Sequence, residues 1–211
     1  MSVYALSDRR RDASPEPDNG GSRPALSREA LVADFLSICA LDPAVEALRA
    51  PAPPATFAVG PFELDHVADF ELTRDGETVL VDVATDAELA RHPLRTPLAA
   101  GAVRAEDGRF FTVETARSLR AEPRFSTVRL IRACRRTPVG AGDRVRILHH
   151  LDEVGTAPLV EVAGAAHTGD GVSAVLALAC EGLVTVEIDA PILPETRVRR
   201  RKTAYADPFG F

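Results

Sequence analysis

The sequence predicts an α/β protein in which a mixed sheet flanked by helices is followed by a small, mainly helical domain. Strand-like and helix-like segments alternate up to residue 121, and an Asp-Gly turn at residues 75–76 joins two of the strands. Beyond residue 124 the apolar residues recur almost throughout at helical spacing. We expect a disordered tail, an α/β domain and a helical domain over residues 1–25, 26–121 and 122–211, respectively.

The first segments are the tail and a capped helix. The tail is polar, rich in Pro, Gly and Ser, and lacks hydrophobic periodicity, which is typical of disordered chains. Ser27 then provides an N-cap for a helix whose apolar residues share one face, and Asp42-Pro43 ends that helix. Residues 43–48 predict a short helical turn, and a proline-rich break follows.

After this break the hydrophobic period becomes two, which predicts strands. A short strand covers residues 56–59 and a long strand covers residues 62–72. The long strand has an apolar face and an acidic face, so that one side faces a core and the other faces solvent. His66 falls on the apolar side, and we expect it to be a packed core residue rather than a metal ligand.

The Asp-Gly pair at residues 75–76 is the strongest hairpin signal, because it readily supplies the positive φ values of a type I′ turn. If Arg74 pairs with Glu77, the register places Asp69 directly opposite Asp82. Opposed carboxylates with Cβ atoms about 5 Å apart are unfavourable unless solvent, an arginine or a metal ion compensates them. A divalent cation is one such remedy.

The remaining segments complete the α/β half and then form the helical half. In the first, helices are expected at residues 86–94 and 96–105, a strand at 109–114 and a short helix at 114–123. In the second, helices are expected at residues 124–136, 142–155, 159–167 and 170–182, and strands at 183–189 and 195–201. Three short helices followed by a strand pair are typical of a winged-helix-like unit, although its recognition-helix segment is mostly apolar.

Charge is distributed unevenly along the chain. The formal charge of -6 argues against a uniformly basic nucleic-acid binder, but residues 1–108 carry a net -9 and residues 109–211 a net +3. Nine arginines between residues 117 and 146 face only Glu122 and Asp143, which indicates either a phosphate footprint or an ordinary solvated helix face. The candidate DNA-binding residues are Arg129, Arg132, Arg135, Arg136, Arg197, Arg199, Arg200, Arg201 and Lys202.

Cysteine spacing and hydrophobicity argue against a zinc site, a membrane-spanning segment and a signal peptide. Cys39, Cys134 and Cys180 are odd in number and far apart, and they lack zinc-ligand spacing, so we expect buried free thiols. No apolar run is long enough to cross a bilayer, and the N-terminus lacks the hydrophobic core of a signal peptide. We therefore expect a cytoplasmic protein that does not contact a membrane.

Three segments carry a resemblance to a known family. They are LSREALVADFLSICALDPAVEALRAPAPPATFAV, HVADFELTRDGETVLVDVAT and RFFTVETARSLRAEPRFSTVRLIRACRR. In order and spacing they resemble the TnsA-like branch of the PD-(D/E)XK nucleases, over about residues 26–200. The resemblance implies a restriction-endonuclease-like mixed sheet, Mg²⁺-dependent cleavage at transposon ends, and two partners besides DNA: an integrase-type transposase and an ATPase regulator.

The family's catalytic set is only partly present. Asp69 and Asp82 match its two acidic positions, which would hold the metal. The lysine expected two residues after Asp82 is Ala84, and the only lysine in the chain is Lys202. The glutamate expected in the first helix falls at Val32. Glu29 lies one turn earlier, about 4.5 Å along the helix axis, and is the residue that would substitute.

Three hypotheses follow from these residues. The first is a catalytically impaired TnsA-like protein that contacts DNA or a transposase partner and needs no metal. The second is an active Mg²⁺-dependent endonuclease with Glu29, Asp69 and Asp82 as its altered catalytic set. The third is a protein-interaction module without a nucleic-acid role. We favour the first, because the missing lysine and carboxylate weaken both water activation and metal binding.

Overall fold

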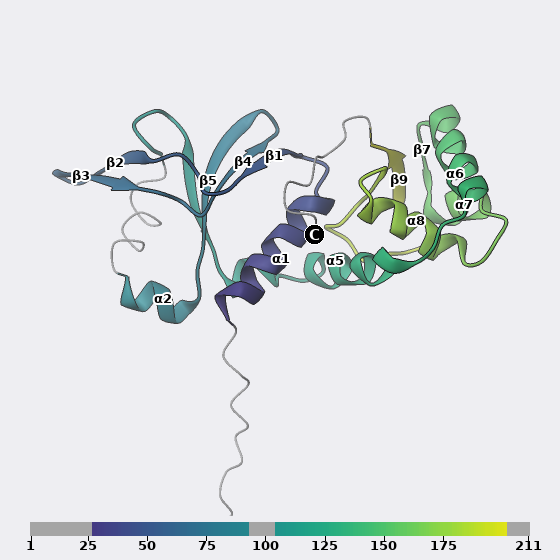
Figure 1. Ribbon diagram of the computed structural model, residues 1–211, viewed down its shortest axis with the longest axis horizontal. Coiled ribbons are helices and arrows are strands. Elements are labelled where there is room, and N and C mark those ends of the chain that lie inside the picture. The colour runs from purple at the N-terminus through teal and green to yellow at the C-terminus, as the bar shows by residue number, and fades with distance from the viewer. Residues whose placement is uncertain (1–26, 93–103, 202–211) are drawn as a thin grey trace, which may run out of the picture.

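The computed structural model describes residues 27–92 and 104–201. The expected tail and Lys202 lie outside the described residues, as does nearly all of the helix expected at residues 96–105. The described residues form an elongated molecule in which the strands of the N-terminal half lie toward one end, while most of the helices and a second group of strands lie toward the other (Figure 1).

A four-stranded mixed sheet organises the N-terminal half, with the strand order β1-β4-β5-β6. The first two pairings, β1 with β4 and β4 with β5, are antiparallel, whereas β5 and β6 are parallel. The strands are β1 (Val45–Arg49), β4 (Phe70–Arg74), β5 (Glu77–Val83) and β6 (Phe110–Glu114). The expected mixed α/β architecture is confirmed.

The hairpin of β4 and β5 has the expected register. Asp75 and Gly76 have φ values of 50° and 77°, and Arg74 is the Cα partner of Glu77. The ladder continues as far as Phe70 and Val81, so that Asp69 directly precedes β4 while Asp82 lies within β5. The local turn chemistry therefore fixes which residues approach each other at the far end of the hairpin.

Two local expectations are wrong. The long strand over residues 62–72 is broken at residues 67–69: β3 (Phe62–His66) pairs with β2 (Ala55–Val59) in a separate two-stranded sheet. Phe62, placed by alternation on the core face, is 72% exposed at the end of this projecting hairpin. Residues 45–49 form strand β1 rather than a helical turn, because pairing with β4 outweighs the local helical signal.

Helix α1 (Arg28–Leu41) covers one face of the main sheet. Ser27 caps it as expected, since its hydroxyl accepts a hydrogen bond from the Ala30 N–H at 3.3 Å. The rings of Phe35 and Phe70 lie 5.0 Å apart and join this helix to β4. Two short helices, α2 (Asp86–Arg91) and α4 (Ala116–Leu119), flank β6 in the chain.

The C-terminal half contains the expected helices and a three-stranded antiparallel sheet of order β7-β9-β8. Strand β7 was not expected, because a three-residue segment between two helices leaves no periodic signal. The helices are α5 (Arg124–Ala133), the 3₁₀ turn η1 (Cys134–Arg136), α6 (Ala141–Val154), α7 (Leu159–Gly164) and α8 (Gly171–Cys180). The strands are β7 (Thr156–Pro158), β8 (Val184–Val186) and β9 (Arg197–Arg200).

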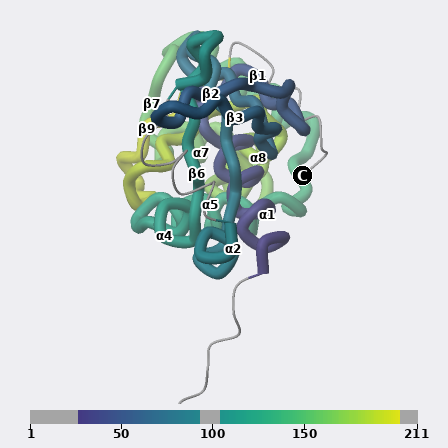
Figure 2. The backbone as a smooth tube through the Cα atoms, turned by 90° about the vertical axis from the view of Figure 1, so that its left-hand side faces the viewer, coloured from purple at the N-terminus to yellow at the C-terminus, as the bar shows by residue number. Residues whose placement is uncertain are grey.

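One hydrophobic core runs through both halves. It includes Leu31 of α1, Phe70 of β4, Ile131 of α5 and Leu178 of α8. A second, smaller core lies under the β2–β3 hairpin, where Phe57, Leu80 and Phe111 are buried together. The view from the hairpin end places β2 and β3 in front of α1 and the C-terminal helices (Figure 2). The domain boundary at residues 121–122 stays a prediction, since packed side chains continue across it.

The cysteines and the helix lengths bear on two further expectations. Cys39, Cys134 and Cys180 are free thiols as expected, although only Cys39 is fully buried. Burial raises the pKa of the Cys39 thiol to about 12. Within residues 27–92 and 104–201, no helix combines the length and the apolar character that a membrane crossing requires.

Candidate functional site

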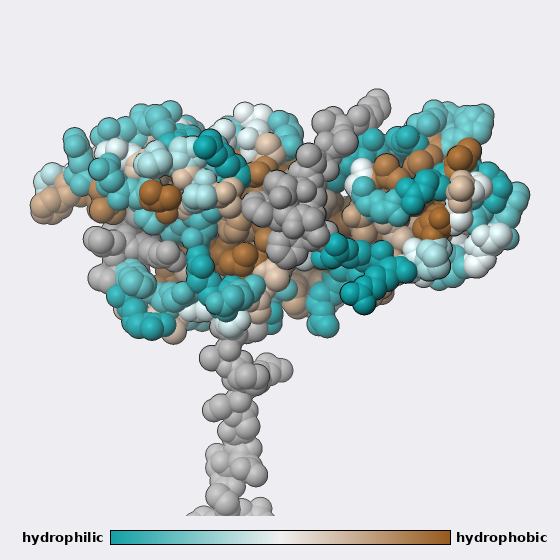
Figure 3. All heavy atoms as spheres, viewed as in Figure 1, coloured by the Kyte–Doolittle hydropathy of each residue, from teal (hydrophilic) through white to brown (hydrophobic). Residues whose placement is uncertain are grey.

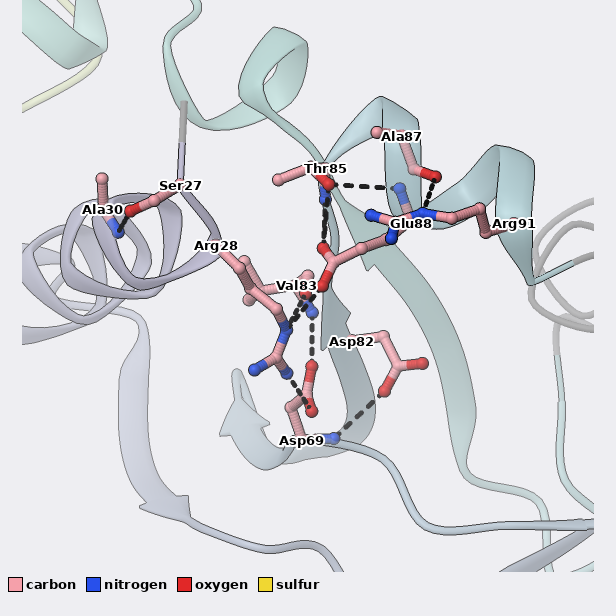
Figure 4. A network of polar contacts seen from close by, with 10 residues as sticks. All are labelled: Ser27, Arg28, Ala30, Asp69, Asp82, Val83, Thr85, Ala87, Glu88 and Arg91. Carbon is pink, nitrogen blue, oxygen red and sulfur yellow. Dashed lines mark hydrogen bonds and ion pairs between the residues drawn. The ribbon is translucent and has the colours of Figure 1, made fainter. Parts of the chain in front are cut away.

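The structure brings Asp69 and Asp82 together at the end of the β4–β5 hairpin. The Asp69 backbone N–H donates to Asp82 Oδ1 at 3.1 Å, and the Val83 backbone N–H donates to Asp69 Oδ2 at 2.8 Å. The two residues therefore adjoin, as the register predicted, but each carboxylate is directed toward a different partner (Figure 4).

Arg28 is the partner of Asp69. This side chain comes from the first residue of α1, and its Nη2 lies 2.5 Å from Asp69 Oδ1. Its Nε donates to the Val83 carbonyl at 3.1 Å, while Glu88 Oε1 lies 3.9 Å from the same nitrogen. Partial burial disfavours the charge on Arg28, yet the hydrogen bond and the negative charge of Asp69 raise its pKa above the ordinary value.

His66 is the partner of Asp82, whose side chain is fully buried. The His66 Nε2 lies 2.9 Å from Asp82 Oδ2, and the edge of the imidazole ring packs against Phe111 with centroids 5.7 Å apart. The expectation of a packed histidine is correct, but its contact with a carboxylate was missed. A signal was present, since His66 lies three residues before Asp69 in the segment that resembles the family motif.

The other positions of the expected catalytic set lie elsewhere or lack the chemistry. Glu29 is exposed, and hydrogen bonds from its own backbone N–H and from Ser27 lower its pKa. No contact joins Glu29 to either aspartate among the described residues. Ala84 is fully buried, and Val32 packs against the main core. The lysine and glutamate positions of the family are thus apolar here.

This donor set does not fit Mg²⁺. The ion requires a near-octahedral set of hard oxygen ligands. Here one carboxylate is bound by a guanidinium, and the other accepts hydrogen bonds from a backbone amide and contacts an imidazole. Among the residues that the structure describes, no cluster of three or more His, Cys, Asp or Glu side chains is arranged to hold a metal ion.

A pocket of about 630 Å³ opens beside Arg28, between the start of α1 and the junction of β5 with α2. Its lining carries mixed charge, with Arg28 and Arg91 against Glu29, Asp86 and Glu88. Thr85 caps α2 there, and Glu88 completes the capping box by accepting from the Thr85 backbone N–H. The pocket exposes Arg28 to solvent, whereas neither Asp69 nor the fully buried Asp82 lines it.

Some of the candidate DNA-binding arginines are exposed to solvent, and others are held by contacts within the protein. Arg201 donates to the backbone carbonyls of Ala40, Asp42 and Val45, so it joins the end of β9 to the end of α1. Arg200 lies 3.6 Å from Asp152. Arg132 is half-buried, and Figure 3 shows hydrophilic surface over α5, to which it belongs. The exposed members are Arg129, Arg135, Arg136, Arg197 and Arg199, of which Arg199 also donates to Thr185.

In the folded protein, the excess of positive charge over residues 117–146 is smaller than a count of residues along the chain suggests. Several of these side chains form ion pairs with carboxylates, and most of those carboxylates lie on other elements, which a count along the chain cannot detect. The pairs are Arg120–Asp34, Arg124–Asp42, Arg144–Glu181 and Arg146–Asp143. The positive charge of this span is therefore partly balanced by ion pairs, and its interpretation as a phosphate footprint stays a prediction.

The fold and the site define a mixed α/β protein in which a pair of adjacent aspartates is neutralised by an arginine and contacted by a histidine. No protein-family model matches the chain, and a search of curated proteins finds no match. A functional assignment therefore depends on the chemistry of the residues themselves.

Proposed function

We propose that this protein is a nuclease-fold, TnsA-like protein that contacts DNA beside a transposase partner and does not cut it. One observation carries the proposal. Arg28 donates to Asp69 at 2.5 Å, at the position where a nuclease of this kind would bind its metal ion. The guanidinium of Arg28 thus takes the place of a bound metal ion.

The arrangement of the elements supports the fold part of this proposal. The aspartates lie on a central hairpin of a mixed sheet with α1 packed on one face, which fits a restriction-endonuclease-like sheet. In the C-terminal half, the order α6, β7, α7, α8, β8, β9 fits a winged-helix unit whose strand pair returns beside β7.

The chemistry of the site supports the loss of cleavage. Phosphodiester hydrolysis at a carboxylate site needs a metal ion that polarises the phosphate, and a group that positions or activates water. Arg28 supplies positive charge, but a guanidinium stays protonated in proteins and offers no open coordination position. Ala84 supplies neither charge nor hydrogen bond. In this site a cation balances the negative charge of Asp69, as it would in a metal centre, but the reactivity of a metal ion is missing.

DNA contact is supported by the exposed arginines of the C-terminal half. These side chains reach solvent from α5, η1 and β9, and phosphate contacts by arginine supply most sequence-independent affinity for DNA. An overall negative charge does not oppose this, because a local basic surface is sufficient for binding.

Two assays on the purified protein test the proposal. Duplex DNA titrated by fluorescence anisotropy from about 50 to about 200 mM salt should bind with an affinity that falls as salt rises. Supercoiled plasmid with Mg²⁺ or Mn²⁺ should be nicked no faster than by an Asp69→Ala variant. Salt-independent or absent DNA binding would support an interaction module instead. Nicking that Asp69→Ala abolishes would establish the endonuclease hypothesis.

A further inference from the structure

A second concave site lies between the two halves, away from the aspartates. It is a groove of about 460 Å³, bordered on one side by the end of α1 and the end of β4, and on the other by the strands β7, β8 and β9. Arginines project from both sides: Arg74 from β4, and Arg197 and Arg199 from β9. Residues distant in sequence therefore bring three arginines to one groove, which Asp42, Glu187 and Asp189 also line.

The strand geometry of β9 aims two of these arginines in the same direction. Arg197 and Arg199 are exposed and flank Val198, which is fully buried, so their side chains leave the same face of the sheet. Arg199 is paired in register with Thr156 on β7 and with Thr185 on β8. Its Nε donates to Thr185 Oγ1 at 3.0 Å, and this contact orients the guanidinium.

The positive charge that an anion could use lies mainly on β9 once the ion pairs of the groove are assigned. Asp42 and Asp189 line it, but both contact Arg124, at 2.6 Å and 3.3 Å. Arg74 reaches the same Asp42 at 3.4 Å. Glu187 is the lining carboxylate that pairs with no arginine in the part of the chain described here. The lining thus contains as many carboxylates as arginines, and Arg197 and Arg199 are the lining arginines that form no ion pair within the described residues.

The arginines on α5 and η1 offer a weaker site. Arg129 lies over the Phe125 ring at 5.7 Å, and the depression beside it, of about 280 Å³, is lined by residues of α1 and α5. That depression contains Asp34, which already pairs with Arg120. These arginines lie on α5 and on the adjoining turn η1, and the residues of α1 that line the other side of the depression, Asp34 and Ser37, are not basic. The groove is therefore the better phosphate site of the two.

We propose that this groove binds the phosphate backbone of duplex DNA, with Arg197 and Arg199 on one wall and Arg74 on the other. This inference rests on the proposed DNA contact, and it specifies where the backbone runs. Threonine hydroxyls and arginine guanidinium groups are ordinary phosphate ligands. These groups would contact phosphates and not base edges. The contact therefore positions the protein and adds affinity without sequence preference.

The test compares matched variants of the full chain with a labelled DNA duplex. Arg197→Gln/Arg199→Gln removes two groove charges, and Arg129→Gln/Arg136→Gln removes two charges of the competing surface on α5 and η1. The control, Arg49→Gln/Arg91→Gln, removes two exposed charges that belong to neither surface. The groove variant should lose at least about tenfold in affinity, and the slope of log affinity against log salt should fall by about 2. Arg74→Gln, from the opposite wall, should lower the slope by about 1. The control should change neither quantity by a comparable amount.

Three results would overturn the inference. If the native protein binds DNA and the groove variants bind with unchanged slope, the groove is not the site, while the proposed function stands. If Arg129→Gln/Arg136→Gln loses as much affinity as the groove variant or more, the contact lies on α5 and η1. If the native protein shows no salt-dependent binding, the proposed function fails together with this inference. Circular dichroism of each variant confirms that the fold is retained, and Arg74→Gln provides an independent arm.

Discussion

The Arg28 guanidinium donates to the Asp69 carboxylate at 2.5 Å and links the first turn of α1 to the end of the β4–β5 hairpin. The same guanidinium donates to the Val83 carbonyl, and the Val83 backbone N–H donates to Asp69. Helix, hairpin and carboxylate thus form one closed set of polar contacts.

Arg28→Ala should lower the free energy of unfolding by about 1 kcal/mol, since the pair is partly exposed and solvent screens it. The change should shrink as salt rises. Urea unfolding at low and high salt measures both effects. Arg91→Ala is the matched control, because Arg91 is an exposed arginine that lines the same pocket. Equal losses in the two variants would contradict a specific role for Arg28.

His66→Ala should destabilise the protein by about 1–3 kcal/mol, because it removes a partner of a carboxylate that is fully buried. His66→Gln should recover part of the loss, since the amide N–H₂ can donate to Asp82. Thermal and urea unfolding measure these changes. His149→Ala supplies the control, because that imidazole is 70% exposed. A His66→Ala variant as stable as the control would show that the contact with Asp82 has no energetic weight.

Cys39 should make stability depend on alkaline pH. Its folded pKa is raised to about 12 by burial, whereas a thiol in the unfolded chain ionises near pH 8.5. The folded state therefore holds its proton where the unfolded state releases it, and stability falls as pH rises above about 8.5. Urea unfolding of the native protein and of Cys39→Ala should diverge progressively between about pH 8.5 and pH 10. If the stabilities of the two proteins fell in parallel as pH rises, the raised pKa of a buried Cys39 thiol would be contradicted.

The β2–β3 hairpin offers a direct comparison of a buried and an exposed phenylalanine. Phe57→Ala should cost about 3–5 kcal/mol, because Phe57 is fully buried in the smaller core. Phe62→Ala should change stability by less than about 0.5 kcal/mol, since this ring is exposed at the hairpin end. Chemical denaturation measures both. A large loss for Phe62→Ala would restore the single long strand that the sequence alone predicts.

Local signals predicted the parts of the fold that depend on local chemistry. The Ser27 cap, the Asp-Gly turn and the helical spacing beyond residue 124 all specify backbone geometry within a few residues. The register of the hairpin then follows, and with it the approach of Asp69 and Asp82. These features are encoded where they occur in the chain, so no knowledge of tertiary contacts was needed.

The features that were missed depend on contacts between distant segments. Strand β1 exists because β4 provides an edge for it, and the break between β3 and β4 exists because β3 has another partner in β2. Arg28 was overlooked for the same reason: its partner lies 41 residues away in the chain. The sequence allowed an arginine as one way to compensate two aspartates, but it could not identify which arginine.

The most direct test of the central claim is Mn²⁺ binding by isothermal titration calorimetry, with the native protein and Asp69→Ala compared at neutral pH. If Arg28 and His66 already occupy the carboxylates, the two proteins should give the same featureless heats, and neither should show a saturable site. A saturable site in the native protein that disappears in Asp69→Ala would contradict the account and make the aspartate pair a metal centre.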